Sequence, residues 1–428
     1  MLNRTIAPKI IDPVQFDIKL PGCQKYKLTN GIEVYAVDMG SEDVLMVNWV
    51  FSAGNWFENK KAVASATNFL LKNGTSKRNA FEVNEHFEYY GSHLNRSCYN
   101  ETAEITLHTL SKHINELLPV VAELVQDAVF PQEELDTYSQ NAQQRLRVNL
   151  QKGEFVAARL IDAYLFGQDH PYGKFMELAD YAAVQREDVV NFYNEYYKHG
   201  NCVIFVAGKL PKDIIETLEK NFGHLPLKPR IGGAETIQHP VQPAAQKKYQ
   251  LLNDPNGVQS AIRIARPFPN RHHPDFQKVM VLNNVLGGFF GSRLMGNIRE
   301  EKGYTYGIYS YLLNFTNESG WMVSTEAGRD VTAETVKEIY YEMEQLREEE
   351  IDEEELMMTR NSMIGSILGD LDGPFHVIGR WKSMILNNVD ENYFDRSVQI
   401  IKTITAKELQ ELAVKYLVPE EFYELVVI

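Results

Sequence analysis

The alternation of apolar and polar positions divides the chain into strands and helices. Residues 44–52 form a nearly continuous apolar run of strand length, which predicts a strand covered on both faces of a sheet. Apolar positions at helical spacing predict amphipathic helices, and period-two segments bounded by turn residues predict further strands. On these criteria, helices are predicted at residues 62–71, 81–90, 114–129, 133–151, 154–166 and 187–197, and strands at 27–36 (a pair around an Asn-Gly turn), 44–52, 96–107 (a pair) and 201–208.

The second half of the chain repeats this order. Residues 258–266 match the strand at 44–52, 276–285 match the helix at 62–71, and 303–327 match the strand pair near residue 100. The long helices predicted at 331–350 and 353–371 match those at 114–129 and 133–151, and each half ends with a helix closing on a tyrosine, a short loop and a terminal strand. This pattern predicts an internal duplication of mixed α and β structure.

A change of composition separates the two halves. Residues 223–248 contain four prolines, a Gly-Gly pair and little periodic apolar pattern, which predicts a linker. The expected domains are therefore residues 1–222 and 249–428, joined by the linker 223–248.

Composition restricts the class of protein. With 428 residues, 44% apolar and 24% charged, the chain has a globular composition, and its formal charge of -15 argues against nucleic acid as a partner. Three widely separated cysteines favour neither a disulfide framework nor a metal cluster. The first 16 residues lack the pattern of a signal peptide, and no apolar stretch is long enough to span a membrane. We therefore expect a cytoplasmic protein, or a periplasmic one if a signal has been removed.

The segment GSRLMGNIREEKGYTY, residues 291–306, combines a short helix with two polar side chains suited to binding a peptide. Arg299 is expected near the end of the helix and Tyr306 at the start of the following strand. A guanidinium and a phenol in this arrangement can donate hydrogen bonds to a peptide carbonyl. A solvated helix face and an ordinary sheet tyrosine would give the same pattern. The preceding GGFFG, residues 287–291, either shapes a binding chamber or forms a tight turn.

The duplicated order, HPYG at residues 170–173 and SRLMGNIREEKGYTYG resemble the M16 (pitrilysin or insulinase type) metallopeptidases, in particular the short two-domain M16B-like members. The resemblance covers nearly the whole chain. It implies an α+β fold of two tandem, duplicated α/β sandwich domains of the LuxS and mitochondrial processing peptidase type, each a roughly six-stranded sheet covered by helices. It also implies that Arg299 and Tyr306 hold the substrate backbone near the bond to be cleaved. His170 is expected to pack within its turn.

The family's zinc motif, His-x-x-Glu-His shortly before a Gly-Thr, is degenerate in this chain. Gly74 and Thr75 set the register, and the positions of the two histidines and the glutamate then fall on Ser65, Asn68 and Phe69. None of these side chains supplies the expected zinc ligand or general base. The third ligand would fall near residues 138–145, where no carboxylate is present and Arg145 would repel a metal. We expect no metal or other cofactor in this chain.

The resemblance includes paired proteins in which one subunit carries the zinc and the other the arginine and tyrosine. It therefore implies a non-catalytic subunit, inactive alone, which holds an extended peptide through Arg299 and Tyr306 for hydrolysis by a zinc-bearing M16 partner. The alternative is a homodimer of the same fold that binds peptides or supports assembly without proteolysis. An independent enzyme using other residues is not favoured, because the sequence contains no recognisable Ser/His/Asp or Cys/His motif.

Overall fold

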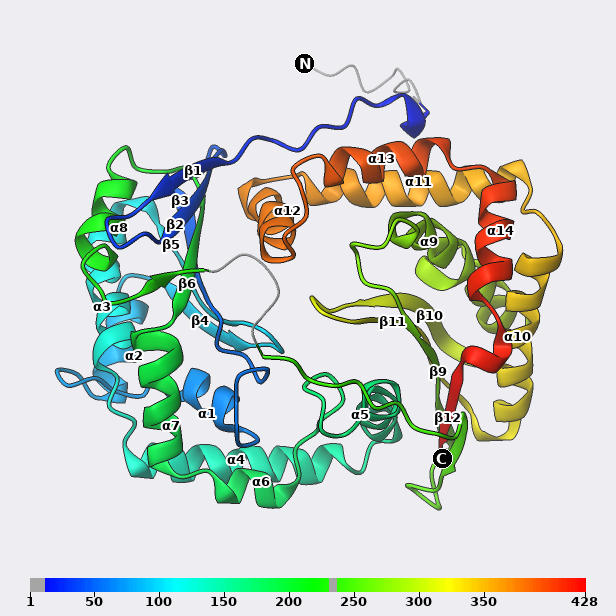
Figure 1. Cartoon of the computed structure of the whole chain (residues 1–428), viewed down its shortest axis with the longest axis horizontal. Helices are drawn as coiled ribbons and strands as arrows, with labels where there is room; N and C mark the ends of the chain where they lie inside the picture. The colour runs from blue at the N-terminus through cyan, green and yellow to red at the C-terminus, as the bar shows by residue number, and fades with distance from the viewer. Residues whose placement is uncertain (1–11, 231–236) are drawn as a thin grey trace.

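The computed structural model describes residues 12–230 and 237–428, and in it the chain forms two α+β halves (Figure 1). The sequence predictions for the first 11 residues and for the Gly-Gly pair at 232–233 lie outside the described residues. Among the described residues, every helix is too short or too polar to cross a bilayer. The domain limits at residues 222 and 249 stay predictions.

The first half is built on a sheet with the strand order β1-β2-β6-β3-β5-β4, to which β7 adds beside β6. Its central strand β3 is buried along most of its length, because both faces of the sheet are covered. The elements are β1 (Gln24–Lys27), β2 (Glu33–Asp38), β3 (Val44–Phe51), α1 (Val63–Leu70), α2 (Ala80–Tyr89), β4 (His93–Cys98), β5 (Ala103–Leu110), α3 (Ile114–Asp127), α4 (Gln132–Asn149), α5 (Gly153–Phe166), α6 (Leu178–Ala183), α7 (Arg186–Tyr193), β6 (Asn201–Gly208), α8 (Ile214–Phe222) and β7 (Lys228–Pro229).

The second half repeats this plan on a sheet with the order β10-β11-β9-β12-β8. The duplication is closest in α4 and α11, which are both 18 residues long, and in β6 and β12, which pair antiparallel with β3 and β9. The elements are β8 (Lys248–Leu251), β9 (Gln259–Phe268), α9 (Phe276–Asn283), β10 (Thr305–Asn314), β11 (Ser319–Gly328), α10 (Thr332–Glu348), α11 (Glu353–Asp370), α12 (Pro374–Leu386), α13 (Tyr393–Thr403), α14 (Ala406–Tyr416) and β12 (Tyr423–Val427).

One helix from each half packs on the sheet of the other half. Helix α5 packs on β9 and β12, where Val156 and Ala157 join a core with Ala261 and Leu425. Helix α12 packs on β2 and β6, where its residues Val377 and Ile378 join the buried face of the first sheet. Burying such aliphatic side chains contributes about 1.5–3 kcal/mol each. Each sheet therefore depends on a helix of the other half to cover its second face.

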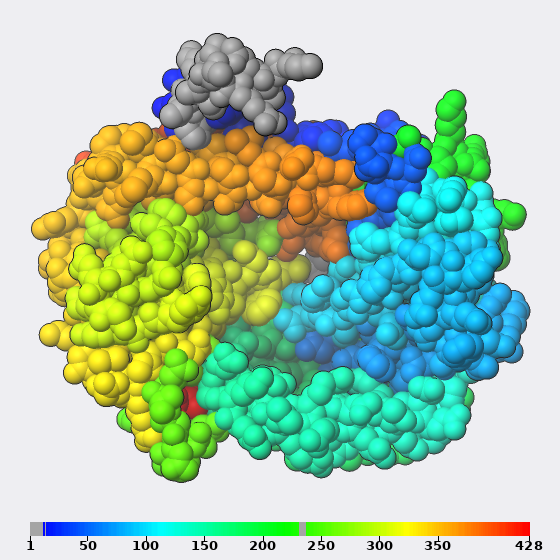
Figure 2. Space-filling model, turned by 180° about the vertical axis from the view of Figure 1, so that it is seen from behind, coloured from blue at the N-terminus to red at the C-terminus, as the bar shows by residue number. Residues whose placement is uncertain are grey.

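The tip of the β10–β11 hairpin closes a third contact between the halves, which we call the hairpin clasp. The Thr316 N–H donates to Glu101 Oε1 at 3.1 Å, and the Asn317 N–H donates to the Tyr172 hydroxyl at 3.1 Å. The Tyr172 hydroxyl donates in turn to Glu101, and the Phe315 ring stacks on the Tyr172 ring at 4.2 Å between centroids. In the space-filling view, a hollow lies between the halves, bounded by the teal helices below and the orange helices above (Figure 2).

Candidate functional site

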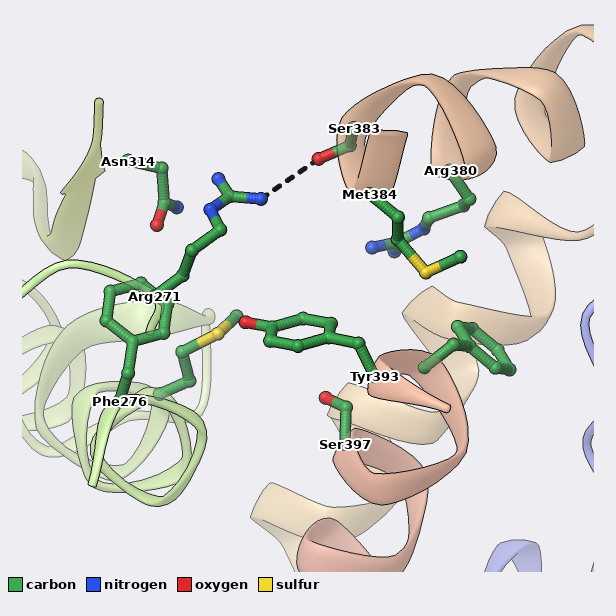
Figure 3. A pocket seen from close by; sticks show the side chains of 10 residues that line it. Arg271, Phe276, Asn314, Arg380, Ser383, Met384, Tyr393 and Ser397 are labelled. Carbon is green, nitrogen blue, oxygen red and sulfur yellow. Dashed lines mark hydrogen bonds between the residues drawn. The ribbon is translucent and has the colours of Figure 1, made fainter. Parts of the chain in front are cut away.

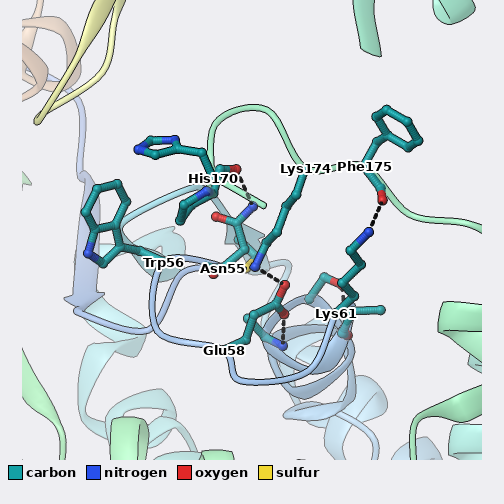
Figure 4. Close-up of polar contacts among 12 residues, drawn as sticks. Asn55, Trp56, Glu58, Lys61, His170, Lys174 and Phe175 are labelled. Carbon is teal, nitrogen blue, oxygen red and sulfur yellow. Dashed lines mark hydrogen bonds and ion pairs between the residues drawn. The ribbon is translucent and has the colours of Figure 1, made fainter. Parts of the chain in front are cut away.

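Helix α1, which carries the positions of the zinc motif, begins at a buried ion pair (Figure 4). The Glu58 carboxylate lies 2.8 Å from Lys174 Nζ and accepts the Ala64 N–H at 3.0 Å, so it also satisfies the first turn of the helix. Lys174 donates to the Asn55 carbonyl at 2.8 Å. Burial raises the pKa of Glu58, and the charge of Lys174 opposes that shift. The start of α1 is therefore held by interactions that leave Glu58 little capacity for another partner.

The three motif positions on α1 are occupied by groups that bond within the protein. Ser65 Oγ lies 3.1 Å from the Ala62 carbonyl, to which it donates, and 3.2 Å from the Tyr138 hydroxyl. The Asn68 amide donates to the Glu104 carbonyl at 3.3 Å and to the hydroxyl of the buried Tyr197 at 3.1 Å. Asn68 thus has a structural role in the core.

Phe69 completes the replacement, because a cation covers its ring. The Arg96 guanidinium lies 5.0 Å from the ring centroid and also donates to the Phe69 carbonyl. Burial lowers the pKa of Arg96 to about 10, so it stays positive at neutral pH, and burial raises the pKa of Tyr138 to about 12, so it stays neutral. A serine, an amide, a phenyl ring, a phenol and a cation do not fit zinc. In the described part of the chain, no three His, Cys, Asp or Glu side chains group as metal ligands.

A cavity of about 520 Å³ lies beside this position, between the two halves. Ser65, Glu58 and Cys98 line it from the first half, and Asn314 and Phe315 line it from the hairpin of the second half. Burial raises the pKa of Cys98 to about 12, so its thiol is protonated and is a poor nucleophile. His170 is buried and its Nδ1 accepts the Tyr172 N–H at 3.2 Å, as expected for a histidine that packs its turn.

The segment with Arg299 forms a short helical element, η5 (Met295–Glu301), before β10. Met295 and Ile298 are buried against the core, so Arg299 lies on the other side of the element, with its side chain 29% exposed. Its guanidinium lies 4.7 Å from the ring centroid of Phe290 and 5.8 Å from that of Tyr306. We call these three residues the clamp. The structure brings together the two predicted residues and adds Phe290.

A local irregularity in β10 turns Tyr306 outward. The pairing with β11 shifts register between Thr305 and Ile308, and the Thr305 hydroxyl donates to the Glu326 carbonyl at 2.7 Å. The Thr325 hydroxyl donates to the Gly307 carbonyl at 2.9 Å. A bulge of this kind re-aims a side chain, and the Tyr306 side chain is 90% exposed. Since the nearest acid to Arg299, Glu300, is 3.9 Å away, the guanidinium keeps donors for another group.

The clamp and the degenerate zinc position do not share a cavity. Asn314, at the far end of β10, lines the cavity that contains Ser65 and is eight positions further along the strand than Tyr306. At about 3.3 Å per residue, this places the clamp roughly 25 Å along the strand from that cavity. Within one chain, Arg299 therefore cannot act on a group bound at Ser65.

The sequence did not predict the part played by Phe290. Two interpretations of residues 287–291 were open, and both describe part of the outcome. A side chain at Gly287 would lie 2.8 Å from the Ser310 backbone nitrogen, so the turn requires a glycine for close approach. Phe290 is 57% exposed and supports Arg299, so the same segment also shapes the candidate site. The signal available in the sequence was a pair of aromatic residues in a turn.

Comparison with known proteins shows family models matching both halves. Insulinase (Peptidase family M16) matches residues 38–170, and Peptidase M16 inactive domain matches residues 183–363. The uncharacterized zinc protease YmxG of Bacillus subtilis is 22% identical over 353 residues, covering 82% of this chain and 84% of the relative.

Solved structures show the same fold at low sequence identity. The peptidase M16 inactive domain from Pseudomonas fluorescens superposes with a TM-score of 0.85 at 22% identity, covering 95% of this chain and 98% of that one. A protease from Helicobacter pylori gives a TM-score of 0.84 at 19% identity, covering 96% and 100% of the two chains. The predicted fold, two tandem α/β sandwich domains, is confirmed.

Proposed function

Because this chain belongs to peptidase family M16 and its α1 lacks the family's zinc ligands, we propose that it is the non-catalytic subunit of a two-chain M16 peptidase. In this proposal a second M16 chain supplies zinc and the general base. This chain supplies Arg299 and Tyr306, which bind the substrate backbone beside the bond that the partner cleaves. Alone, it hydrolyses no peptide.

The observation that carries the proposal is the clamp itself. Arg299 is held between Phe290 and Tyr306 at the surface, with donors left for another group, at the opposite end of β10 from the degenerate zinc position. An N–H of Arg299 and the O–H of Tyr306 can donate to one carbonyl oxygen, and they stabilise the negative charge that develops on that oxygen during hydrolysis. The carbonyl that the clamp binds lies far from the degenerate zinc position of this chain. The zinc that acts on that carbonyl must therefore come from a partner chain.

An extended peptide is the substrate class that fits this arrangement. Among the described strands, β10 pairs only with β11, so its other edge is an edge of the sheet. An edge strand accepts a peptide by main-chain hydrogen bonds, and Tyr306 lies at the start of that edge. We place the complex in the cytoplasm, since the composition favours a reducing compartment.

The test is to purify the chain with an M16 chain that has an intact zinc motif and to measure cleavage of a fluorogenic peptide. We expect Arg299→Ala and Tyr306→Phe each to lower turnover by about ten- to a thousandfold, because each removes a donor to the transition state. The zinc content of the partner should not change. Matched controls are Arg147→Ala on the exposed face of α4 and Tyr89→Phe at an exposed position of α2.

Two results would contradict the proposal. The first is unchanged turnover in both clamp variants, which would make Arg299 and Tyr306 structural residues. The second is chelator-sensitive hydrolysis by this chain alone. A third result would favour the alternative, a homodimeric binding protein. In that case the chain alone forms a dimer that binds peptide, and no peptide is cleaved when a zinc-bearing M16 chain is added.

A further inference from the structure

A small cavity in the second half contains an arginine that has no acidic partner. The cavity measures about 150 Å³ and lies between the loop before α9, the end of β10, and helices α12 and α13 (Figure 3). Arg271 from the loop reaches into it. No acidic side chain lines it; the lining residues are Arg271, Phe276, Met280, Asn314, Arg380, Ser383, Met384, Tyr393, Phe394 and Ser397.

The bonding of Arg271 is incomplete. Its Nη1 donates to the Ser383 hydroxyl at 3.1 Å, while its Nε is buried without a hydrogen-bond partner. Among the described residues, no carboxylate lies within ion-pair distance of this guanidinium. Burial lowers the pKa of Arg271, and Tyr393 and the more distant carboxylate of Glu101 oppose that shift only in part. A buried charge without a counter-charge is unfavourable, so proteins usually pair it.

Two other arginines of low exposure follow that rule, whereas Arg96 does not, since its guanidinium lies over the Phe69 ring and donates to the Phe69 carbonyl. Arg293 makes two bonds to the Glu355 carboxylate, at 2.7 and 2.9 Å. Arg263 pairs with Glu326 at 2.9 Å and also donates to main-chain carbonyls. Arg380, the second cation at the cavity, is already paired with Asp370. Of the two cations that line this cavity, Arg271 is the one without an acidic partner in ion-pair contact.

From this geometry we propose that the cavity binds a small oxyanion, a carboxylate or a phosphate group, through Arg271 and Ser383. The guanidinium presents a planar fork of donors that matches such a group. In Figure 3, the side chains of Tyr393 and Ser397 lie on the opposite side of the same space, where their hydroxyls provide further donors. The volume is about that of five water molecules, which suits a single oxyanion group and not a larger ligand.

The position of the cavity makes two sources of the oxyanion possible. Asn314 lines both this cavity and the 520 Å³ cavity between the halves, so the terminal carboxylate of a peptide bound there has a short path to Arg271. On the other side, Arg271 and Tyr393 also line a cavity of about 520 Å³ with His272 and Arg396, through which a free anion can reach the site. Both sources use the same chemistry at Arg271.

The experiment measures binding of potassium phosphate and potassium acetate to the full chain alone, by the rise in melting temperature at constant ionic strength in chloride-free buffer. We expect a saturable rise with at least one anion, and an affinity at least about tenfold weaker in Arg271→Gln, because hydrogen bonds to a charged group are lost. Arg147→Gln, the same change at an exposed position of α4, should bind as the unaltered protein does.

Two further measurements complete the test. If a short peptide binds more tightly as its free acid than as its C-terminal amide, the source of the oxyanion is a peptide terminus. If the acid and the amide bind equally and phosphate binding saturates, the source is a free anion. Ser383→Ala keeps the cation and should weaken anion binding by a smaller factor. If Arg271→Gln does not fold, this variant tests the proposal in its place. The proposal is overturned if neither anion gives a saturable effect, or if binding survives unchanged in both variants. Since no partner or peptidase activity is involved, failure here leaves the proposed function untouched.

Discussion

In the first half, the side chains at the candidate catalytic position on α1 are bonded into the core, whereas in the second half the clamp leaves its donors unused at the surface. The Asn68 amide donates to the Glu104 carbonyl and to the Tyr197 hydroxyl, and the Arg96 guanidinium covers the Phe69 ring. Arg299 rests against two rings and has one acid at 3.9 Å. Two halves with the same order of elements therefore differ in which one keeps capacity for a ligand.

The largest expected effect comes from forcing the first half back toward the metal motif. Asn68→Glu places a carboxylate at a position that is 3% exposed, where the present side chain donates to the Glu104 carbonyl, a group that a carboxylate cannot bond. We expect a loss of about 3–5 kcal/mol in the free energy of unfolding, measured by chemical denaturation. Asn141→Glu, the same change on the exposed face of α4, should cost little.

Restoring all three motif residues, Ser65→His, Asn68→Glu and Phe69→His, should likewise fail to create a zinc site. Arg96 and the protonated Tyr138 still occupy the surroundings, and the region of the third ligand offers no carboxylate. Metal analysis after dialysis should find substoichiometric zinc. One tightly bound zinc per chain, with stability retained, would contradict this expectation. It would show that the first half lacks only the three ligand side chains of a zinc site.

The next effect concerns the helices that the two halves exchange. On α12, Lys382 forms an ion pair with Glu104 of the first sheet at 2.6 Å. On α5, Asp162 lies near Arg263 of the second sheet, yet burial dominates and raises the pKa of Asp162 to about 7 from an ordinary value of 3.8. One exchanged helix is thus held by a formed ion pair, while the other carries a carboxyl that resists ionisation.

The pH dependence follows from the sign of that shift. Because the pKa of Asp162 is raised in the folded state, its contribution is complete below about pH 4 and is lost as pH rises toward 7. Asp162→Asn should therefore raise the free energy of unfolding at about pH 8, by roughly 1–4 kcal/mol, and change it little at about pH 4. Denaturation of both proteins across this range measures the difference, with the exposed Asp169→Asn as control. A uniform effect at all pH values would exclude this origin.

Much of the fold followed from the sequence because apolar spacing reports buried faces. The runs at 44–52 and 353–371 became β3 and α11, and the repeat of element order located both halves. The strand counts were less accurate: about six per sheet were expected, and the described sheets have seven and five. The pattern did not predict α6, α8, α12 or α13, and it could not show the exchange of α5 and α12. Periodicity identifies a face that is buried, but not the sheet that buries it.

For the candidate site as well, the positions of the residues could be predicted from the sequence, but their contacts could not. Ser65, Asn68 and Phe69 were placed by their spacing from Gly74, which is local information. Their packing by Tyr138 and Arg96 depends on elements far away in the sequence. The contact of Phe290 with Arg299 depends on the conformation of a turn, and that conformation is fixed by the close approach of Gly287 to β10.

A smaller effect tests whether the hairpin clasp holds the halves together. Tyr172→Phe removes the hydroxyl that accepts the Asn317 N–H and donates to Glu101, leaving both groups short of a partner. We expect a loss of about 1–3 kcal/mol in the free energy of unfolding. Tyr99→Phe, at a 55% exposed position nearby, should have no comparable effect. Equal stability of the two variants would mean that the exchanged helices alone hold the halves.

The smallest expected effect concerns Phe290, and it bears most directly on the difference between the halves. If the clamp is prepared in advance, the ring of Phe290 restricts the guanidinium of Arg299 before a peptide arrives. A cation at 4.7 Å from an exposed ring gains about 0.5–1 kcal/mol, so Phe290→Ala should weaken peptide binding by roughly two- to fivefold. Titration with a peptide should show this loss, whereas Phe81→Ala, on the exposed face of α2, should show none. Combining Phe290→Ala with Arg299→Ala should add nothing, because the ring acts only through the guanidinium. Full additivity would instead mean that Phe290 contacts the peptide itself.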